Sequence, residues 1–426
     1  MARTLLSTTS RVSAPVIIAK MGDASFGLYN KRSGVDVEVF NRYYKAHEVL
    51  YPNYLTSLEV VKLNGALNTY TLKIEYQITQ FSDPNLIDRL LSTVSSTRKI
   101  VFTYGDAMLP QYMYREEEAI ITEISQDVST NDAKIEYTLK AVSTAIGLSA
   151  SIHNFPARPG TKPSRVIYEL LSDKSWGLQE IFYGMNNIQW VRECNVIAEN
   201  DRSVDIPAKT GITVLDYLKY LVDIMVPDTS LLATQEAIKG GIYVLTIHDA
   251  VSENFSGPYF SVTLVDPSVV NTSNNSLDYY EVDIGYPDKD YISSFTINNN
   301  QAYSILYDYS GKVAADQYVY RIDDNGEVTP IGSPNFGRSP QKLAATELDR
   351  NWWSKIVEFP ITAAMSIRGL LRAIILMSYI KVNIYYFGRK YNASGIYIVT
   401  KQVDQIDQNG YKTTLNLTRV KGDDTV

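Results

Sequence analysis

The sequence predicts a mainly β protein with some α: two related antiparallel β-barrel domains, each with a helix, flank a small α/β domain. Three observations predict this fold. Period-two hydrophobic patterns dominate both ends of the chain, two amphipathic helix patterns lie between them, and one β-hairpin of the first part recurs in the last. At 426 residues the chain is also two to four times the usual domain size. We expect domains at residues 1–150, 151–285 and 286–426.

Residues 1–150 carry mostly strand patterns. The N-terminal stretch superficially resembles a transit peptide, but it lacks a continuous apolar centre, and we expect a short arm leading into a strand at residues 15–19. The clearest strand is YTLKIEYQIT, in which apolar and polar residues alternate from residue 70. A helix is predicted in NLIDRLLSTV, with Asp83 as its N-cap and Pro84 at its first position. Further strands are expected in KIVFTY, MYREEEAIITEIS and AKIEYTLKAV.

Residues 151–285 combine helices with strands. PSRVIYELLSDKSWG predicts a helix that begins at Pro163 and ends before Gly177. TVLDYLKYLVDIMVP predicts a second helix, with Thr213 as its cap, Pro227 as its stop and a continuous apolar stripe. GGIYVLTIHD and YFSVTLVD read as strands, and the Asn- and Ser-rich residues 271–276 read as a connector.

Residues 286–426 return to β patterns. Strands are expected in YISSFTINNNQAYSILYDYSG and VEFPITAAMSI, a hairpin turn at Asn325-Gly326, and a helix in SPQKLAATELDRNWWSKIV that begins with Ser339 as its N-cap. The apolar stretch LLRAIILMSYIKVNIYYF could be mistaken for a membrane span. Arg372 and Lys381 lie inside it, and its second half alternates with period two, so that half is predicted to be a strand. The last pattern is the hairpin GIYIVTKQVDQIDQNGYKTTLNLTRV, residues 395–420.

That last hairpin has an earlier counterpart in the same chain. IITEISQDVSTNDAKIEYTLKAV, residues 120–142, aligns with it at an offset of 278 residues without a gap. Thr122 then matches Thr400, Lys134 matches Lys412 and Leu139 matches Leu417 in addition to further apolar pairs. The alignment predicts two related barrels per chain. Three copies in a ring would present six nearly equivalent barrels, so that a threefold object could dock on a sixfold one.

Composition narrows the possible functions. A formal net charge of −7 without a long basic run disfavours a protein that grips nucleic-acid phosphates. The single cysteine, Cys194, excludes an intramolecular disulfide and a Cys-rich zinc cluster. The 32 Tyr residues fit either a β-rich surface or a dedicated Tyr-lined interface.

No residue pattern points to catalysis, to a cofactor or to a metal site. His47, His153 and His248 have no zinc-ligand spacing, and they read as surface or satisfied core residues. The acidic stretches REEEA and DIGYPDKDY read as solvated strand edges rather than as the paired carboxylates of a glycosidase. Trp352 and Trp353 could form a sugar platform, but we expect at least one of them in the core.

The ordered series of patterns resembles the baseplate hub proteins of contractile-tailed bacteriophages, which are akin to late control protein D and to the base of type VI secretion spike proteins. KPSRVIYELLSDKSWGL followed by TGITVLDYLKYLVDI resembles the paired helices of the family's intermediate domain. The segment from LAATELDRNWW to SYIKVNI resembles its helix and two strands, and residues 395–420 resemble its closing hairpin. The chain departs from the family after Gly369, where the apolar LLRAIILMS replaces a second small or Gly-rich turn.

The resemblance implies a structural, non-enzymatic hub of the virion's tail baseplate, assembled in the host cytoplasm. Three copies would form a ring of tail-tube-like barrels with pseudo-sixfold symmetry, joining the sixfold tail tube to the threefold spike. The implied partners are further copies of the chain, a tail spike protein, a tail tube or tube-initiator protein and baseplate wedge proteins. DNA would be only a passing cargo, no membrane anchor is expected, and a spike, lysozyme or peptidase would be separate proteins.

A different class of function stays open from the residues alone. The Trp pair and the clustered acids would suit a carbohydrate-binding or carbohydrate-cleaving tail-tip protein. The residues of any subunit interface are not identified by the sequence patterns.

Overall fold

The computed structural model describes the chain in segments. These are residues 2–4, 15–22, 24–29, 51–52, 55–77, 92, 99–106, 115–129, 133–150, 152–172, 189–190, 201–225, 242–249, 259–265, 279–285, 292–299, 319–322, 328–331, 361–368, 376–391 and 393–422.

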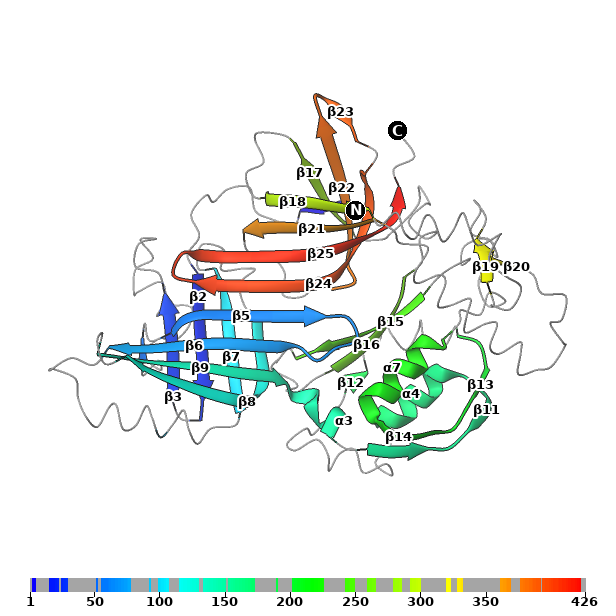
Figure 1. Cartoon of the computed structure of the whole chain (residues 1–426), viewed down its shortest axis with the longest axis horizontal. Helices are drawn as coiled ribbons and strands as arrows, with labels where there is room; N and C mark the ends of the chain where they lie inside the picture. The colour runs from blue at the N-terminus through cyan, green and yellow to red at the C-terminus, as the bar shows by residue number, and fades with distance from the viewer. Residues whose placement is uncertain are drawn as a thin grey trace.

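One hydrogen-bonded sheet of 16 strands dominates the described part of the chain (Figure 1). Its N-terminal strands are β1 (Ala2–Thr4), β2 (Pro15–Met21), β3 (Ala24–Tyr29), β4 (Tyr51–Pro52), β5 (Leu55–Leu63), β6 (Thr69–Gln77), β7 (Lys99–Asp106), β8 (Arg115–Ser129) and β9 (Lys134–Ser143). Its C-terminal strands are β17 (Tyr279–Ile284), β18 (Ile292–Asn299), β21 (Ile361–Arg368), β22 (Tyr379–Tyr386), β23 (Arg389–Lys390), β24 (Gly395–Asp407) and β25 (Gly410–Gly422). The mainly β prediction is therefore confirmed.

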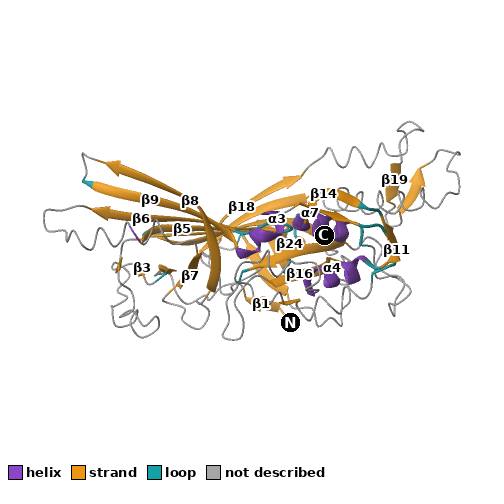
Figure 2. Cartoon of the chain, turned by 90° about the horizontal axis from the view of Figure 1, so that it is seen from below, coloured by secondary structure: helices purple, strands orange, loops and turns teal. Residues whose placement is uncertain are grey.

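The α/β segment, whose helices lie together in Figure 2, packs around its own apolar core. Helices α4 (Pro163–Ser172) and α7 (Val214–Asp223) begin where the sequence predicts, and Thr213 caps α7 by accepting a hydrogen bond from the Asp216 N–H at 3.1 Å. The other elements are η4 (Thr144–Ile146), α3 (Gly147–Ala150), β10 (Ile152–Phe155), β11 (Arg158–Thr161), β12 (Gln189–Trp190), β13 (Val204–Ile206), β14 (Lys209–Thr213), β15 (Ile242–His248) and β16 (Tyr259–Val265).

Several predicted strands are confirmed by their burial. In β6, Tyr70, Leu72, Ile74 and Tyr76 are buried and alternate with more exposed polar residues. The second half of the apolar stretch at residues 370–387 forms strand β22, as predicted. No helix among the described residues is long and apolar enough to cross a membrane. β19 (Val319–Ile322) and β20 (Val328–Ile331) pair in the antiparallel manner expected on either side of Asn325-Gly326.

Other predictions lie outside the described residues. They are the helices at residues 85–94 (apart from Ser92) and 339–357, the connector at residues 271–276, and the part of the corner at residues 369–375. The domain boundaries at 150 and 285, and the closure of the strands into barrels, stay predictions. One element was missed: residues 2–4 of the expected arm form β1, which pairs in parallel with Tyr279–Glu281 of β17.

Two five-stranded units of the sheet have the same strand order. The N-terminal unit runs β5-β6-β9-β8-β7, and the C-terminal unit runs β18-β21-β25-β24-β22, with every neighbouring pair antiparallel. Each unit has its own apolar core. Each strand of one unit thus has a counterpart in the other unit, at the same place both in the sheet and along the chain, as expected of an internal repeat.

The two units also share their irregularities. In β8 the register shifts between Ile121 and Glu123, and in β24 it shifts between Val399 and Lys401, so Thr122 and Thr400 are the extra residues of two bulges. The hydroxyl of Thr122 donates to the carbonyl of Lys140, and that of Thr400 donates to the carbonyl of Asn416, each at 3.2 Å.

A second shared bulge lies in the outer strands of the units. The pairing of β5 with β6 shifts between Leu55 and Ser57, and the pairing of β18 with β21 shifts between Ile292 and Ser294. Because bulges are specific local features, two coincident bulges support the repeat more strongly than hydrophobic alternation does.

The repeat corrects the ungapped alignment of the hairpins. Asp407 follows Ser129 by 278 residues, whereas their partners across the turns, Gly410 and Lys134, differ by 276. The first hairpin therefore has a turn two residues longer, and Leu139 corresponds to Leu415 rather than to Leu417. A shift of two keeps every side chain on its face of the sheet, so the apolar pattern does not reveal it.

We expect the Thr213→Ala substitution to lower the free energy of unfolding by about 1 kcal/mol, because the N-terminus of α7 loses the acceptor of the Asp216 N–H. Denaturant unfolding followed by circular dichroism measures the loss. Thr213→Ser keeps the hydroxyl and serves as the control, and equal stability of Thr213→Ala and the wild type would contradict this role.

Candidate assembly interface

The two units are joined edge to edge by strand β24. Its first residues, Gly395–Ile398, pair with β22 of the C-terminal unit, and Lys401–Asp407 pair antiparallel with Ser57–Leu63 of β5. The bulge at Thr400 lies between these two stretches. The strand therefore leaves one unit and completes the other, and Ile406 together with Tyr411 packs in the core of the N-terminal unit.

Buried polar side chains line this joint on its inner face. Lys62, Gln402 and Asp404 are 2%, 0% and 0% exposed, and Gln402 lies directly opposite Lys62 in the register. The Asp404 carboxylate accepts hydrogen bonds from Thr413 Oγ1 at 2.6 Å, Gln402 Nε2 at 2.6 Å and Tyr411 OH at 3.1 Å. These donors replace the water that the carboxylate loses on burial.

Lys62 connects the buried polar side chains of the joint with the interior of the N-terminal unit. Its ammonium forms an ion pair with Glu117 of β8, and both side chains are almost completely buried. Tyr70 OH donates to the other carboxylate oxygen of Glu117 at 2.8 Å. The pair is thus hydrogen-bonded as well as neutralised, which a buried ion pair requires.

Asp249, which directly follows β15, connects this row to the α/β segment. Its carboxylate accepts hydrogen bonds from Ser143 Oγ at 2.5 Å, Asn68 Nδ2 at 2.7 Å and Tyr70 OH at 3.2 Å. Its backbone carbonyl accepts from the N–H of Glu118 at 3.1 Å. We call Lys62, Asn68, Tyr70, Glu117, Ser143 and Asp249 the polar junction.

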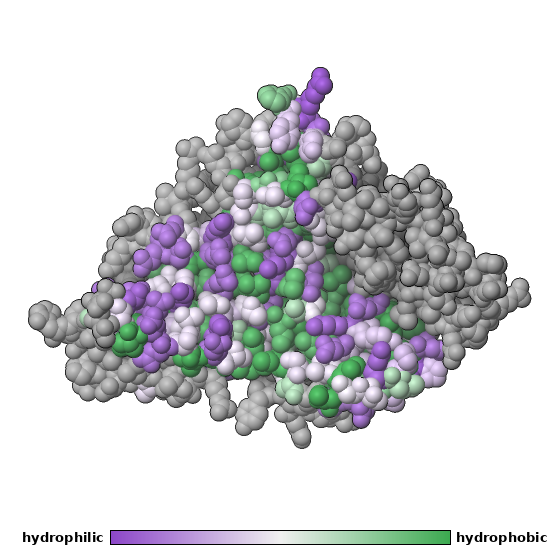
Figure 3. Space-filling model, in the orientation of Figure 1, coloured by the Kyte–Doolittle hydropathy of each residue, from purple (hydrophilic) through white to green (hydrophobic). Residues whose placement is uncertain are grey.

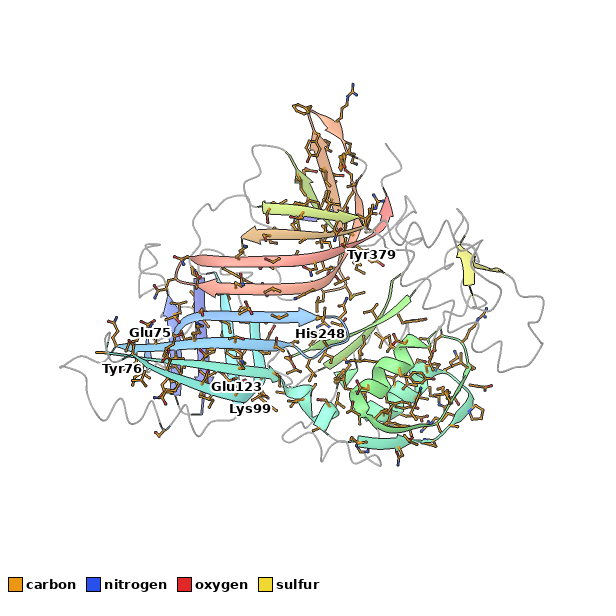
Figure 4. The ribbon with its side chains drawn as sticks, viewed as in Figure 1. Glu75, Tyr76, Lys99, Glu123, His248 and Tyr379 are labelled. Carbon is orange, nitrogen blue, oxygen red and sulfur yellow. The ribbon has the colours of Figure 1, made fainter. Side chains whose placement is uncertain are left out.

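Burial and neighbouring charges shift the pKa values of Asp249 and Tyr70 in the polar junction, and of His248 beside it. Burial raises the pKa of Asp249 to about 6, against the hydrogen bonds from Ser143 and Asn68, and the Glu117 charge raises it further. Burial and then the Asp249 and Glu117 carboxylates raise the pKa of Tyr70 well above its usual value. His248, at the end of β15 (Figure 4), has its pKa lowered to about 3 by burial and by the Lys62 ammonium.

The structure corrects the interpretation of the acids at residues 115–119. Glu117 and Glu118 are 1% and 8% exposed, so they do not form a solvated strand edge. Glu117 pairs with Lys62, and Glu118 forms an ion pair with Lys99 at 2.6 Å. The edge of β8 is also engaged at this point, because the Glu118 N–H donates to the Asp249 carbonyl.

The other sequence candidates do not gather into a site. His153 is partly buried, with its ring 6.1 Å from that of Phe155. His47, Cys194, Trp352 and Trp353 lie outside the described residues. Within the ranges that the structure describes, no three His, Cys, Asp or Glu side chains are grouped so that they could hold a metal ion.

The sequence analysis did not identify the buried polar side chains of the joint, although the hydrophobic pattern indicates them. Lys62 stands on the same alternating face as Leu58 and Val60, and Gln402 and Asp404 stand on the same face as Ile406. Charged or amide residues at inward positions of an apolar alternation indicate a buried polar contact. On the face seen in Figure 3, hydrophilic and hydrophobic side chains are interspersed over the strands of the large sheet.

The geometry defines a class of fold: two repeated antiparallel units joined by one shared strand, with an α/β segment locked against them. The fold is similar to that of two solved tail proteins, and the resemblance drawn from the sequence is confirmed at the level of the fold. The 43 kDa tail protein of prophage MuSo2 from Shewanella oneidensis matches with a TM-score of 0.50 at 9% identity, over 95% of this chain and 98% of that one. The tail protein from Neisseria meningitidis MC58 matches with a TM-score of 0.50 at 9% identity, over 95% and 96%. No family model and no curated protein matches the sequence.

We expect Lys62→Met to destabilise the protein by about 3 to 5 kcal/mol, because it leaves the Glu117 carboxylate buried without its cation. Glu117→Leu should cost a similar amount. The double variant should recover much of the loss, since neither charge is then buried alone. Additive losses in a denaturant double-mutant cycle would contradict the coupling.

The lowered pKa of His248 predicts that the free energy of unfolding decreases in acid. Its folded pKa of about 3 lies below the unfolded value of about 6.5, so its contribution to stability is complete above pH 6.5 and is lost as the pH falls toward 3. The slope should approach about 1.4 kcal/mol per pH unit. Unfolding free energies of the wild type and His248→Gln, measured from pH 7 to 4, should diverge by this slope. Parallel curves would show that His248 does not titrate in this way.

Proposed function

We propose that this protein is a structural baseplate hub of a phage tail. Three copies form a pseudo-sixfold ring that adapts the sixfold tail tube to the threefold central spike. The observation that carries the proposal is the repeat: each chain supplies two units with one strand order and coincident bulges, already joined edge to edge. Three such chains supply six similar units in a ring that repeats after every second unit.

In this proposal each unit closes into a tube-like barrel within a domain, at residues 1–150 and 286–426, and residues 151–285 form the intermediate domain. The match of fold to two tail proteins over almost the whole chain supports a role in a tail. The partners are further copies of the chain, a tail spike protein, a tail tube or tube-initiator protein and baseplate wedge proteins. DNA passes through the lumen, and the protein works in the tail baseplate of the virion.

The structure offers little to the carbohydrate alternative. Two of the acids that could have served as a catalytic pair are engaged elsewhere: Glu117 with Lys62 and Tyr70, and Glu118 with Lys99. A carboxylate held in a buried ion pair is not available to protonate a glycosidic bond. We therefore propose an assembly function without catalysis.

The proposal predicts a defined assembly. By light scattering, the purified chain should have the mass of a trimer, or its complex with the tail tube and spike proteins should contain three copies of the chain. Averaged electron micrographs should show a ring with six similar lobes. A chain that remains monomeric with both partners present, or that binds a glycan as a monomer, would refute the hub.

A further inference from the structure

The hairpin of β22 and β23 ends in exposed aromatic side chains. Its two-residue turn, Phe387-Gly388, is closed by the antiparallel pair of Tyr386 and Arg389. Phe387 is 104% exposed and Tyr386 is 61% exposed, and Tyr391, 44% exposed, places its ring 5.5 Å from that of Tyr386. β23 lies at the top of Figure 1, where hydrophobic and hydrophilic side chains project in Figure 3. We call residues 386–391 the aromatic tip.

Hydrogen bonds below the aromatic tip tie the two sides of the hairpin together. The Tyr391 N–H donates to the Ile384 carbonyl at 2.8 Å, and the Ser394 N–H donates to the Tyr391 carbonyl at 2.9 Å. The hydroxyl of Ser394, a fully buried residue, accepts from the Ile384 N–H at 2.9 Å. The aromatic side chains therefore stand on a hydrogen-bonded support rather than on an unsupported loop.

The turn is an unfavourable place for a phenylalanine. Phe387 and Gly388 have φ angles of 50° and 77°, as in a type I′ turn, which favours Asn followed by Gly. A bulky side chain at positive φ costs conformational energy, and the fully exposed ring of Phe387 gains no burial in return. The stability of the hairpin does not account for this residue, so we look for its role outside the folded chain.

The residue types of the aromatic tip follow an order from the apex inward. Phe387 is at the apex, Tyr386 and Arg389 flank it, and Lys390 follows opposite Tyr385. With about 3.4 Å between successive residues of a strand, the two cations lie roughly 3 to 7 Å behind the apex. An apolar apex with Tyr rings and cations just behind it matches the change from acyl chains to headgroups at a bilayer surface.

The charge around the aromatic tip favours an anionic surface. Residues 359–403 contain six Lys and Arg residues and no Asp or Glu, although the formal net charge of the chain is −7. Arg389, beside the apex, is exposed. Each basic residue close to a surface of anionic lipids adds to the attraction. The aromatic tip is thus a basic and apolar projection of an acidic protein.

A protein partner fits the aromatic tip less well than a bilayer does. Weighted by their exposed fractions, its three aromatic side chains offer about half of the roughly 800 Å² that each side of a stable protein complex buries. The hairpin is only two strands wide here, so it adds little further contact area. A bilayer needs no complementary surface, because its acyl region accepts an apolar side chain of any shape.

We propose that the aromatic tip makes a peripheral contact with an anionic lipid bilayer, in which Phe387 inserts among the acyl chains and Arg389 and Lys390 approach the lipid phosphates. The contact goes beyond the hub function and rests on it only for valency. One tip inserts a single fully apolar side chain and binds weakly, whereas three tips on one face of a threefold ring bind together.

Vesicle capture by a dense layer of the full chain, held by an N-terminal tag, tests the contact. Because each vesicle meets many tips, the measurement does not require a trimer. Vesicles of phosphatidylethanolamine and phosphatidylglycerol should be captured, and vesicles of phosphatidylcholine should be captured at least about tenfold less. Equal capture of both kinds would overturn the preference for an anionic surface.

Phe387→Asn separates membrane binding from folding. Because Asn-Gly is the preferred type I′ sequence, the midpoint of thermal unfolding should stay unchanged or rise. Vesicle capture should fall about tenfold or more, since every tip loses its apolar side chain. Arg389→Gln should lower the capture of anionic vesicles toward that of neutral ones. Tyr168→Ala and Arg165→Gln, at α4 side chains 50% and 75% exposed, are the matched controls and should leave capture unchanged.

Phe387→Trp reports on the depth of the apex. When this variant binds anionic vesicles with brominated acyl chains, its tryptophan emission should be quenched more than that of the wild type, whose four Trp residues lie elsewhere. Equal quenching would overturn the insertion of residue 387.

The outcomes distinguish the aromatic tip from the hub. Absence of vesicle capture, or capture that survives Phe387→Asn, would overturn the membrane contact. If vesicles are not captured and Phe387→Asn instead weakens a complex with the tube or spike protein, the tip binds a protein. A trimer that captures no vesicles would overturn the tip and leave the hub in place. A chain that captures vesicles but stays monomeric with its tube and spike proteins would overturn the hub alone.

Discussion

The backbone ladder between β5 and β24 is the constraint on which the rest of the structure depends. It makes two repeated units into one sheet and inserts Ile406 into the core of the N-terminal unit. It also fixes Lys62 beside Gln402, from where the Lys62 ammonium reaches Glu117. Through Tyr70 and then Asp249 the same chain of contacts reaches the α/β segment. A line of polar contacts thereby links the three apolar cores.

The buried charges on this line restrict the register of the strands. A slip of β24 by one residue would turn Gln402 and Asp404 to the outer face, and Asp404 would lose its hydrogen bonds with Thr413 and Tyr411. Apolar alternation alone tolerates a slip of two, as the different turns of the two hairpins demonstrate. A buried carboxylate with three donors tolerates neither, because its hydrogen bonds hold at one position only.

The sequence predicts what is local and periodic. The apolar stripe and cap of α7 and the alternation in β6 follow from residues within one or two turns or strands, and both were predicted correctly. A two-residue hydrophobic alternation shows which face of the sheet a residue occupies, but it does not show which strand lies beside it. The pairing of β24 with β5 could therefore not be predicted from the sequence. The same limit led to Glu117 and Glu118 being placed in solvent. The inward position of Lys62 was the available signal, and it needed the partner strand to be interpreted.

The order of synthesis gives the edge of β5 a particular exposure. Glu59 and Gln405, hydrogen-bonded at 2.9 Å across the joint, are 346 residues apart in the chain. At 5–20 residues per second, the ribosome needs roughly 20 to 70 seconds to supply β24 after β5 has emerged. During that interval β5 is a sheet edge carrying a lysine on its apolar face, and an inward charge is a common protection of edges against pairing with the wrong strand. Lys62 can therefore oppose wrong pairing at the β5 edge during synthesis, before the same residue becomes buried in the joint with β24.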